Sequence, residues 1–197
     1  MHIDSAGPVG GLRDALAGTE RLIAAIGADD WSKPTPCPEW DVRALVRHLV
    51  AGNLAFASIV SGRAPSQGES HFPEGAPVDA YRESAGALTR AFGRAGALER
   101  MVSVPFGTVP GAVALQLRIT EVLVHGWDVA EAIGATPVFA DDLVEATLAF
   151  ARPWLERIPA GRRPFAPPRA VPAGAPALDR LAATLGREVS GSPRAVT

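Results

Sequence analysis

The sequence predicts an all-α protein built as a bundle of helices. Apolar residues recur at helical spacing over four long segments, and stretches rich in glycine and proline separate these segments. Hydrophobic residues make up 47% of the 197 residues and charged residues 20%, which are ordinary proportions for a globular protein with a core. We therefore expect one domain over residues 1–197, with interior helix faces that can carry a site.

A proline-rich loop separates the first two predicted helices. Apolar spacing predicts a helix over residues 12–26. Residues 33–40 contain three prolines, which lack backbone N–H donors and clash with a preceding helical turn, so this segment is predicted to be a loop. Asp41 is a suitable N-cap for the second helix, which should run to about Val60 and carry His48 on its inward side.

The most apolar predicted helix lies in the middle of the chain. Residues 112–133 are strongly apolar, Pro110 and Gly111 precede them, and Gly134 supplies a stop. The segments before it are predicted as a mobile loop over 61–77, a third helix over 78–97 and an extended connection over 101–110. The segments after it are predicted as a fifth helix from Asp141 or Asp142 to Pro153 or slightly beyond, and a C-terminal extension over 159–197. That extension contains a proline-rich crossing and a short helix at 177–185.

Charge and cysteine content narrow the classes of function. The 19 basic and 21 acidic residues give a net charge of -2, which provides no excess positive field for nucleic acid. The single cysteine, Cys37, cannot form an internal disulfide, and the N-terminus lacks the basic and apolar regions of a secretion signal. No uninterrupted apolar stretch approaches the roughly 20 residues that span a bilayer. We expect a cytoplasmic protein, monomer or homodimer, that binds neither nucleic acid nor membrane.

The central helix carries a carboxylate and an imidazole four residues apart. This spacing places Glu121 and His125 one above the other on one helix face, where both can reach one ion. Their neighbours are apolar, so a buried charge here would be costly without a partner such as a metal. Packing of the second helix against this one would bring His48 towards them. Two imidazoles and one carboxylate suit zinc, and also nickel, iron or cobalt, and leave positions for water or substrate.

An ordinary structural interpretation competes with the metal site. Glu121 and His125 would then form a helix-surface pair, and His48 would be a core histidine with a hydrogen-bond partner. Spacing alone favours this interpretation, because such pairs are common in helices. The choice between the two therefore depends on features beyond the spacing.

Three motifs carry a resemblance to a known family. Residues 35–49, TPCPEWDVRALVRHL, closely resemble the opening signature of the mycothiol-dependent maleylpyruvate isomerase N-terminal domain, a DinB-like family of actinobacteria. Residues 121–130, EVLVHGWDVA, resemble the metal-binding helix of that family. Residues 179–187, DRLAATLGR, resemble the ending of a subgroup described only as metal-binding proteins. The resemblance covers nearly the whole chain.

The resemblance implies a DinB-like four-helix bundle that holds one divalent metal ion through His48, Glu121 and His125. It also implies mycothiol as a thiol cofactor, for isomerisation or for transfer of the thiol to a small electrophile. A bound cation would lower the pKa of such a thiol and present a thiolate to the substrate. The isomerases proper carry a separate C-terminal domain that this chain is too short to match, so the resemblance does not extend to maleylpyruvate as the substrate.

Three further residues are candidates for support of the metal or contact with substrate. Asp128 lies about one turn beyond His125 and could orient its imidazole, or make an ordinary hydrogen bond or salt bridge. Arg118 lies one turn before Glu121 and could bind a substrate carboxylate or simply pair with Glu121. Asn53 on the second helix could line the site.

The remaining polar residues are given no chemical role. Cys37 lies between prolines with no base assured beside it, so we expect it to be packed in the interior rather than to act as a nucleophile. His2 and His71 fall in segments predicted to be flexible and are excluded as ligands. No catalytic residue is assigned.

Three classes of function remain open from the sequence. The first is a metal-dependent enzyme of the thiol transferase or isomerase type, with a small-molecule substrate or thiol as its partner. The second is a non-catalytic bundle that binds a metal or a small ligand. The third is a structural bundle whose polar trio makes internal hydrogen bonds only. The motif resemblance favours the enzyme.

Overall fold

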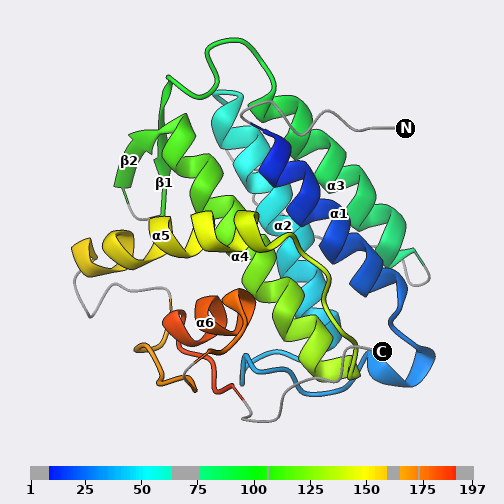
Figure 1. Cartoon of the computed structure of the whole chain (residues 1–197). Coiled ribbons are helices and arrows are strands. Elements are labelled where there is room, and N and C mark those ends of the chain that lie inside the picture. Colours follow the sequence, from blue (N-terminus) through cyan, green and yellow to red (C-terminus); the bar gives the residue numbers. More distant parts are fainter. Residues whose placement is uncertain (1–8, 64–75, 106, 159–164, 173, 190–197) are drawn as a thin grey trace.

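A computed structural model describes residues 9–63, 76–105, 107–158, 165–172 and 174–189. Within these residues the chain is helical apart from loops and one small hairpin (Figure 1), which confirms the predicted all-α class. The elements are α1 (Gly10–Ala24), η1 (Ala28–Asp30), α2 (Val42–Val60), α3 (Pro77–Phe92), β1 (Met101–Val104), β2 (Gly107–Pro110), α4 (Gly111–Ile133), α5 (Asp141–Arg157) and α6 (Ala177–Thr184).

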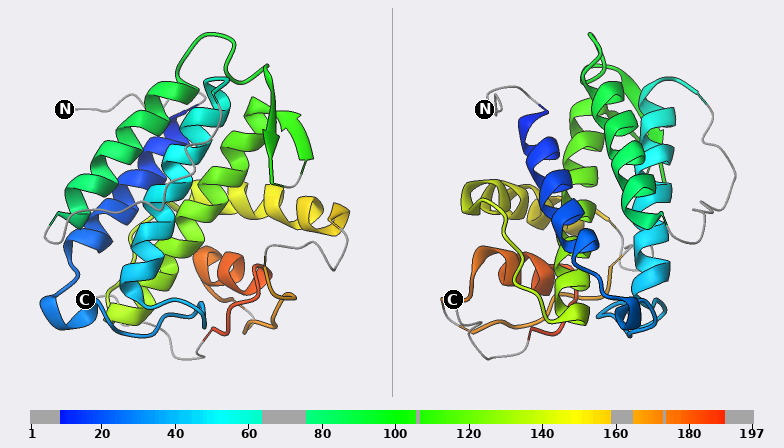
Figure 2. Two further views of the ribbon diagram at one scale, coloured as in Figure 1. Left: turned by 180° about the vertical axis from the view of Figure 1, so that it is seen from behind. Right: turned by 90° about the vertical axis from the view of Figure 1, so that its right-hand side faces the viewer.

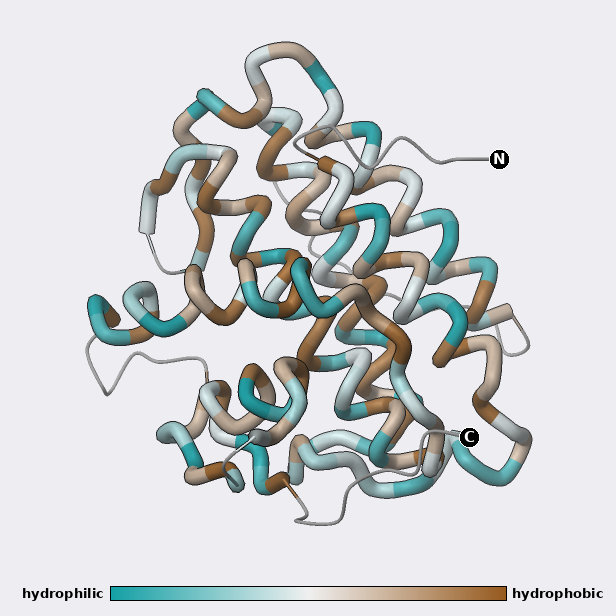
Figure 3. Tube along the Cα trace, in the orientation of Figure 1, coloured by the Kyte–Doolittle hydropathy of each residue, from teal (hydrophilic) through white to brown (hydrophobic). Residues whose placement is uncertain are grey.

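The first four α-helices form the predicted bundle. α2 packs against α3 and α4, and α1 packs against the same two helices from the other side. Hydrophilic and hydrophobic residues alternate along the outer helices α1 and α3 (Figure 3), as expected for helices with one face in solvent. α4 differs because it is buried at nearly every position from Ala114 to Ala130. It is therefore the central helix of the fold.

The C-terminal elements cover the side of α4 that the bundle leaves open. α5 and α6 pack against each other and against α4. In both Figure 1 and Figure 2, α5 crosses the bundle helices and α6 lies next to it, beside the lower half of α4. The extension after α6 then returns to α4, because the Arg187 side chain reaches Asp128 on that helix. α4 is thus contacted by α1 near the start of the chain and by α5 and α6 near its end.

The caps of the two central helices follow the sequence prediction. The Asp41 carboxylate accepts a hydrogen bond of 2.7 Å from the Ala44 amide, which starts α2 at the expected place. α4 ends at Gly134, whose φ of 69° is the left-handed conformation that glycine adopts without steric cost. The predicted loop over 33–40 is also confirmed, and one β-bridge between Pro34 and Asp41 closes it.

One predicted helix end is wrong, and another lies slightly beyond a proline as predicted. The third helix ends at Phe92 and not at residue 97, because Gly93 and Gly96 (φ 72°) turn the chain back towards β1. The fifth helix runs through Pro153 to Arg157, which agrees with the predicted end at Pro153 or slightly beyond. Trp154 stacks on Phe150 with ring centroids 6.0 Å apart, and this packing supports the last turn beyond the missing proline donor.

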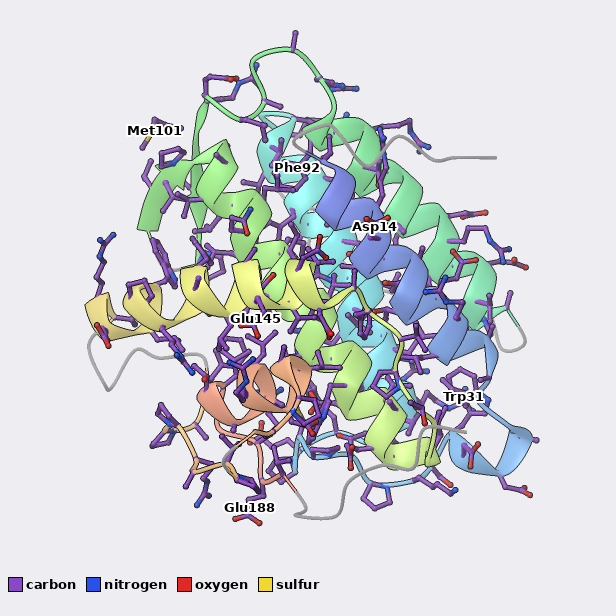
Figure 4. All side chains as sticks on the ribbon, in the orientation of Figure 1. Asp14, Trp31, Phe92, Met101, Glu145 and Glu188 are labelled. Atoms are coloured by element: carbon purple, nitrogen blue, oxygen red, sulfur yellow. The ribbon has the colours of Figure 1, made fainter. Side chains whose placement is uncertain are left out.

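The segment over 101–110 is extended, as predicted, but it pairs with itself as a hairpin. Met101 lies opposite Pro110 and Val104 opposite Gly107 in antiparallel register. The valines of β1 face inward against α2 and α4, while Met101 is 57% exposed and points away from the bundle (Figure 4). The sequence predicted the extended backbone but not the pairing of the two strands.

Two further predictions concern a membrane span and residues that the structure does not describe. α2 is by length and composition apolar enough to cross a membrane, with a mean hydropathy of 1.2, although no such span was expected. α2 is also a core helix packed between α3 and α4, and core helices pass the same test. Most of the predicted loop over 61–77, together with His2 and His71, lies outside the described residues.

Gly111 permits a close approach that should be intolerant of any side chain. A Cβ at this position would overlap the backbone carbonyl oxygen of Ala97 and lie 3.1 Å from the Leu98 Cα atom. Backbone atoms cannot rotate away, so Gly111→Ala should lower the free energy of unfolding by about 1–3 kcal/mol, measured by urea denaturation. In Gly86→Ala the new Cβ would meet only the mobile end of Arg90, and this control should be neutral or slightly stabilising. Equal stability of the two variants would contradict the account.

Candidate metal centre

The packing of α2 on α4 brings the three predicted ligands together. The His48 Nε2 atom on α2 lies 3.4 Å from the Glu121 Oε2 atom on α4. The His125 Nε2 atom, one turn further along α4, lies 3.4 Å from the same oxygen. The ligand atoms of all three residues lie within 4.8 Å of one another, a spacing at which one ion could be held between them.

The loop before α2 covers one side of this trio. The Thr35 hydroxyl donates to the Trp40 carbonyl at 2.8 Å and accepts from the Cys37 amide at 3.1 Å, which fixes the loop. The Trp40 ring consequently lies 4.4 Å from the His48 ring and 5.7 Å from the His125 ring, between centroids. An indole in this position limits the access of water to both imidazoles.

Asp128 supports His125 from the side opposite Glu121. The Asp128 Oδ2 atom lies 2.9 Å from His125 Nδ1, so Nδ1 carries the proton and Nε2 is directed at Glu121. This arrangement of a carboxylate behind a histidine is usual in metal sites, because it fixes the ring orientation and the tautomer. The role suggested for Asp128 by its spacing is thus supported by its contact.

Arg187 is a site residue that the sequence reasoning missed. Its guanidinium binds Asp128 in a two-pronged fashion, from Nε to Oδ1 at 3.1 Å and from Nη2 to Oδ2 at 2.8 Å. The side chain is 7% exposed, and Asp128 is fully buried. Arg187 closes the motif 179–187 that resembled the family, which was the one available signal. Nothing in its spacing indicated that a residue 59 positions away from Asp128 would reach it.

Cys37 lies beside this ion pair and is not packed in the apolar interior as expected. Its sulfur is 3.3 Å from Asp128 Oδ2 and accepts from Arg187 Nη2 at 3.1 Å. Cys37, His125 and Asp128 form a second group with ligand atoms close enough to share an ion. We favour the group with His48 and Glu121, because both Asp128 oxygens already accept hydrogen bonds and a cation there would face the Arg187 guanidinium.

The three groups of the trio shift one another's pKa values, with His125 buried and His48 and Glu121 partly buried. Burial alone would raise the pKa of Glu121, but hydrogen bonds with the two histidines hold it well below its usual value. Burial alone would lower the pKa of His125, but hydrogen bonds, first the one with Asp128, raise it to about 10. The pKa of His48 is lowered, chiefly by burial. Without a metal, His125 therefore carries a proton that a cation would have to displace.

The contacts within the trio are longer than the contact that supports it from outside. Hydrogen bonds between charged partners are usually about 2.7–2.9 Å long. Both histidine nitrogens lie 3.4 Å from the Glu121 oxygen, whereas the supporting contact of His125 with Asp128 is 2.9 Å. The two inner contacts are therefore long and the outer one is short. Two imidazoles and one carboxylate are also a donor set that zinc sites with free coordination positions use.

Two other candidate residues lie one turn away from the trio. Arg118 donates from Nε to the Asn53 carbonyl oxygen at 3.0 Å and from Nη2 to the Leu49 backbone carbonyl at 2.8 Å. Asn53 donates in turn to the Ser84 hydroxyl at 3.0 Å. Arg118 is therefore bonded to α2 and not paired with Glu121, and Asn53 supports Arg118 rather than the proposed ligands.

A cavity of about 1240 Å³ opens onto the trio. His48, Glu121, His125 and Trp40 line one part of it, on the bundle side. The C-terminal elements also contribute to the lining, and their part of it includes the aromatic residues Phe150, Trp154 and Phe165. Glu188, which follows Arg187 at the outer edge of the molecule (Figure 4), also belongs to the lining. A small molecule could therefore contact the trio and an apolar surface at once.

Fold and site together define a helical-bundle protein with a His-Glu-His group at the wall of a large cavity. The sequence profile described as "Mycothiol maleylpyruvate isomerase N-terminal domain" matches residues 12–130, a span that includes all three candidate ligands. The chain belongs to this family, and the resemblance of its motifs is confirmed.

Relatives and solved structures agree with this assignment. Two uncharacterized proteins from two strains of Mycobacterium tuberculosis are each 35% identical over 178 residues, covering 90% of this chain and 94% of the relative. The crystal structure of the mycothiol-dependent maleylpyruvate isomerase superposes with a TM-score of 0.58 at 17% identity, covering 79% of this chain and 72% of that one. A point mutant of it gives 0.62 at 18% identity, over 76% and 70%. At these identities the structures establish the DinB-like helical fold.

Removal of Arg187 should loosen the centre without removing a ligand. Arg187→Ala should weaken zinc affinity about 10- to 100-fold, because Asp128 would lose the partner that holds it against His125. Competition with a chromophoric chelator would measure the affinity. Arg180→Ala is a matched control in the same C-terminal segment, since Arg180 pairs with Glu145 on α5 and not with the centre. Unchanged affinity in Arg187→Ala would rule out the supporting role.

Metal-free protein should become less stable as the pH rises from about 7 to about 10. The folded-state pKa of His125, about 10, lies above the ordinary value of 6.5, so its stabilisation is complete below pH 6.5 and is lost as pH rises through the folded value. The lowered pKa of His48 places its titration below this window. Thermal unfolding of chelator-treated protein across this range would test it, and His125→Gln should flatten the slope. A midpoint that does not change with pH would contradict it.

Proposed function

We propose that the protein is a metal-dependent enzyme that uses a low-molecular-weight thiol, mycothiol, to transfer sulfur to a small electrophile or to isomerise one. The observation that carries the proposal is the convergence of His48, Glu121 and His125 on a large cavity, in a chain of the mycothiol maleylpyruvate isomerase N-terminal domain family. The proposal takes zinc as the first choice of metal, with nickel, iron or cobalt compatible with the same ligands. Maleylpyruvate itself is not proposed as the substrate.

The three ligands and the residues that support them would each have a different role in this chemistry. A bound divalent cation supplies Lewis acidity, which lowers the pKa of a thiol at the centre and favours the thiolate. His125 would present its Nε2 lone pair, because Asp128 holds the proton of the ring on Nδ1. Trp40 would exclude water from one side of the imidazoles. The aromatic wall formed by Phe150 and Trp154 would hold the apolar part of a substrate.

Loss of one ligand should abolish the thiol chemistry. Zinc-loaded protein mixed with mycothiol and a panel of electrophiles, maleylpyruvate included, should consume thiol with at least one of them. His48→Ala should lower that rate by more than about 100-fold, since a ligand should matter more than the 10- to 100-fold typical of a supporting residue. His71→Ala removes a histidine that was excluded as a ligand and should match the wild type.

The same experiment distinguishes the alternatives. Stoichiometric metal uptake with no turnover over a broad panel would instead indicate a binding module. No metal uptake, and no gain in thermal stability on addition of zinc, would leave only the structural bundle, because a ligand that binds the folded state must stabilise it. Equal rates in His48→Ala and wild-type protein would discard the enzyme assigned to this centre.

A further inference from the structure

Arg118 is a buried cation without a carboxylate partner among the described residues. It is 1% exposed, yet no ion pair joins its guanidinium to any aspartate or glutamate that the structure describes. Its two hydrogen bonds go to neutral groups, the Asn53 amide oxygen and the Leu49 carbonyl. The Phe56 ring, with its centroid 5.9 Å from Cζ, adds a weak attraction for the cation. The positive charge is thus held by hydrogen bonds to neutral groups, and Glu121 attracts it without forming an ion pair.

The free edge of the guanidinium faces the cavity. Arginine has five N–H donors, and the bonds of Arg118 use Nε and Nη2 only, which leaves Nη1 without an acceptor among described residues. Among the described residues, the Trp154 indole nitrogen is the only side-chain nitrogen or oxygen that is both buried from solvent and without a hydrogen-bond partner. Nη1 of Arg118 has no partner either, so it is not buried from solvent. Nη1 is therefore open to the cavity, which Arg118 lines.

A glycine on α2 provides the space that the guanidinium occupies. Gly52 lies one turn beyond His48, and a Cβ there would overlap Nη1 and come within 2.8 Å of Cζ. Glycine inside a helix costs roughly 0.5–1 kcal/mol relative to alanine. This destabilising residue lies at the point where the Arg118 side chain packs between α2 and α4. The cation is thereby held one helical turn from both His48 and Glu121.

A buried guanidinium without an ion-pair partner lowers the stability of the protein unless an anion binds to it. Burial lowers the pKa of Arg118, and Glu121 and Tyr81 only partly oppose this effect. Removing a charge from water without a counter-charge is among the costliest changes in a protein interior. The planar fork of arginine matches a carboxylate, which is the reason arginine recognises such groups.

We propose that Arg118 is the anchor for the carboxylate of the substrate, which binds Nη1 beside the metal centre. The substrate class is then a small electrophile with a carboxylate at one end and an apolar body towards Phe150 and Trp154. This assignment rests on the proposed function for the reaction, but the anion site itself needs neither the metal nor the thiol. Arg118 would bind the substrate and position its reactive carbon near the trio.

Benzoate is a suitable probe, because it combines one carboxylate with an aromatic body, and benzamide is its neutral equivalent. Calorimetric titration of zinc-loaded and zinc-free full-length protein should show benzoate binding in both forms and much weaker binding of benzamide. Arg118→Met should weaken benzoate binding about 10- to 100-fold, as expected for loss of a charge-assisted hydrogen bond. Arg118→Lys should recover part of the loss because it keeps the charge.

Gly52→Ala provides a second test that does not depend on removal of the arginine. The added methyl should displace the guanidinium and weaken benzoate at least about tenfold, while a helix gains from alanine and zinc stoichiometry stays unchanged. Gly86→Ala, on α3 and also beside an arginine, should bind benzoate like the wild type. This pair keeps the test valid even where Arg118→Met fails to fold.

The outcomes separate this inference from the proposed function. Benzoate binding in zinc-free protein that depends on Arg118 supports the anchor even when no thiol turnover is found. Wild-type benzoate affinity in both Arg118→Met and Gly52→Ala would overturn it, as would the absence of benzoate binding to wild-type protein at millimolar concentration. Tighter binding of inorganic phosphate than of benzoate, with the same dependence on Arg118, would overturn the assignment of a carboxylate.

Discussion

The contact between α2 and α4 is the constraint on which the site depends. α4 supplies Glu121 and His125 one turn apart, but the third candidate ligand comes from α2, so the trio exists only at the register in which these helices pack. Asp41 fixes where α2 begins, and the apolar face of α2 sets which residues lie against α4. The same register places Gly52 opposite Arg118. The packing of α2 on α4 thus determines the positions of the His48, Glu121 and His125 side chains and of the Arg118 guanidinium.

α4 carries a stripe of charge through an otherwise apolar core. Arg118, Glu121, His125 and Asp128 follow one another at spacings of three, four and three residues, which keeps them on one side of the helix. Their signs alternate when His125 is protonated, and Arg187 adds a positive charge at the end. Along the stripe each charge lies next to one of opposite sign, although no ion pair joins the Arg118 guanidinium to the Glu121 carboxylate. Buried ionic groups rarely increase stability, so the stability of the core does not explain this stripe.

The sequence predicted the fold and the proposed ligands better than the surroundings of the site. Helix periodicity, the Asp41 cap and the Gly134 stop are local signals, and they located α2 and α4 almost to the residue. The spacing of Glu121 and His125 gave their shared face, and the expected packing of the second helix added His48. Spacing alone favoured an ordinary pair, and the family motif was needed to favour a metal. Arg187 was missed because its contact with Asp128 depends on how α6 docks, which no local pattern encodes. The hairpin was missed for the same reason, since strand pairing is a tertiary property.

The position of Arg187 has a consequence for how the site is assembled. The bundle alone can bring the three candidate ligands together, but Asp128 would then be a buried carboxylate supported only by His125 and Cys37. A single buried charge of this kind favours protonation or a turned side chain, and either change would release His125 from its tautomer. The C-terminal extension supplies the counter-charge from outside the bundle. It also supplies the cavity wall at Phe165 and Arg187, so docking of this extension completes the electrostatics of the centre and the shape of the cavity in one step.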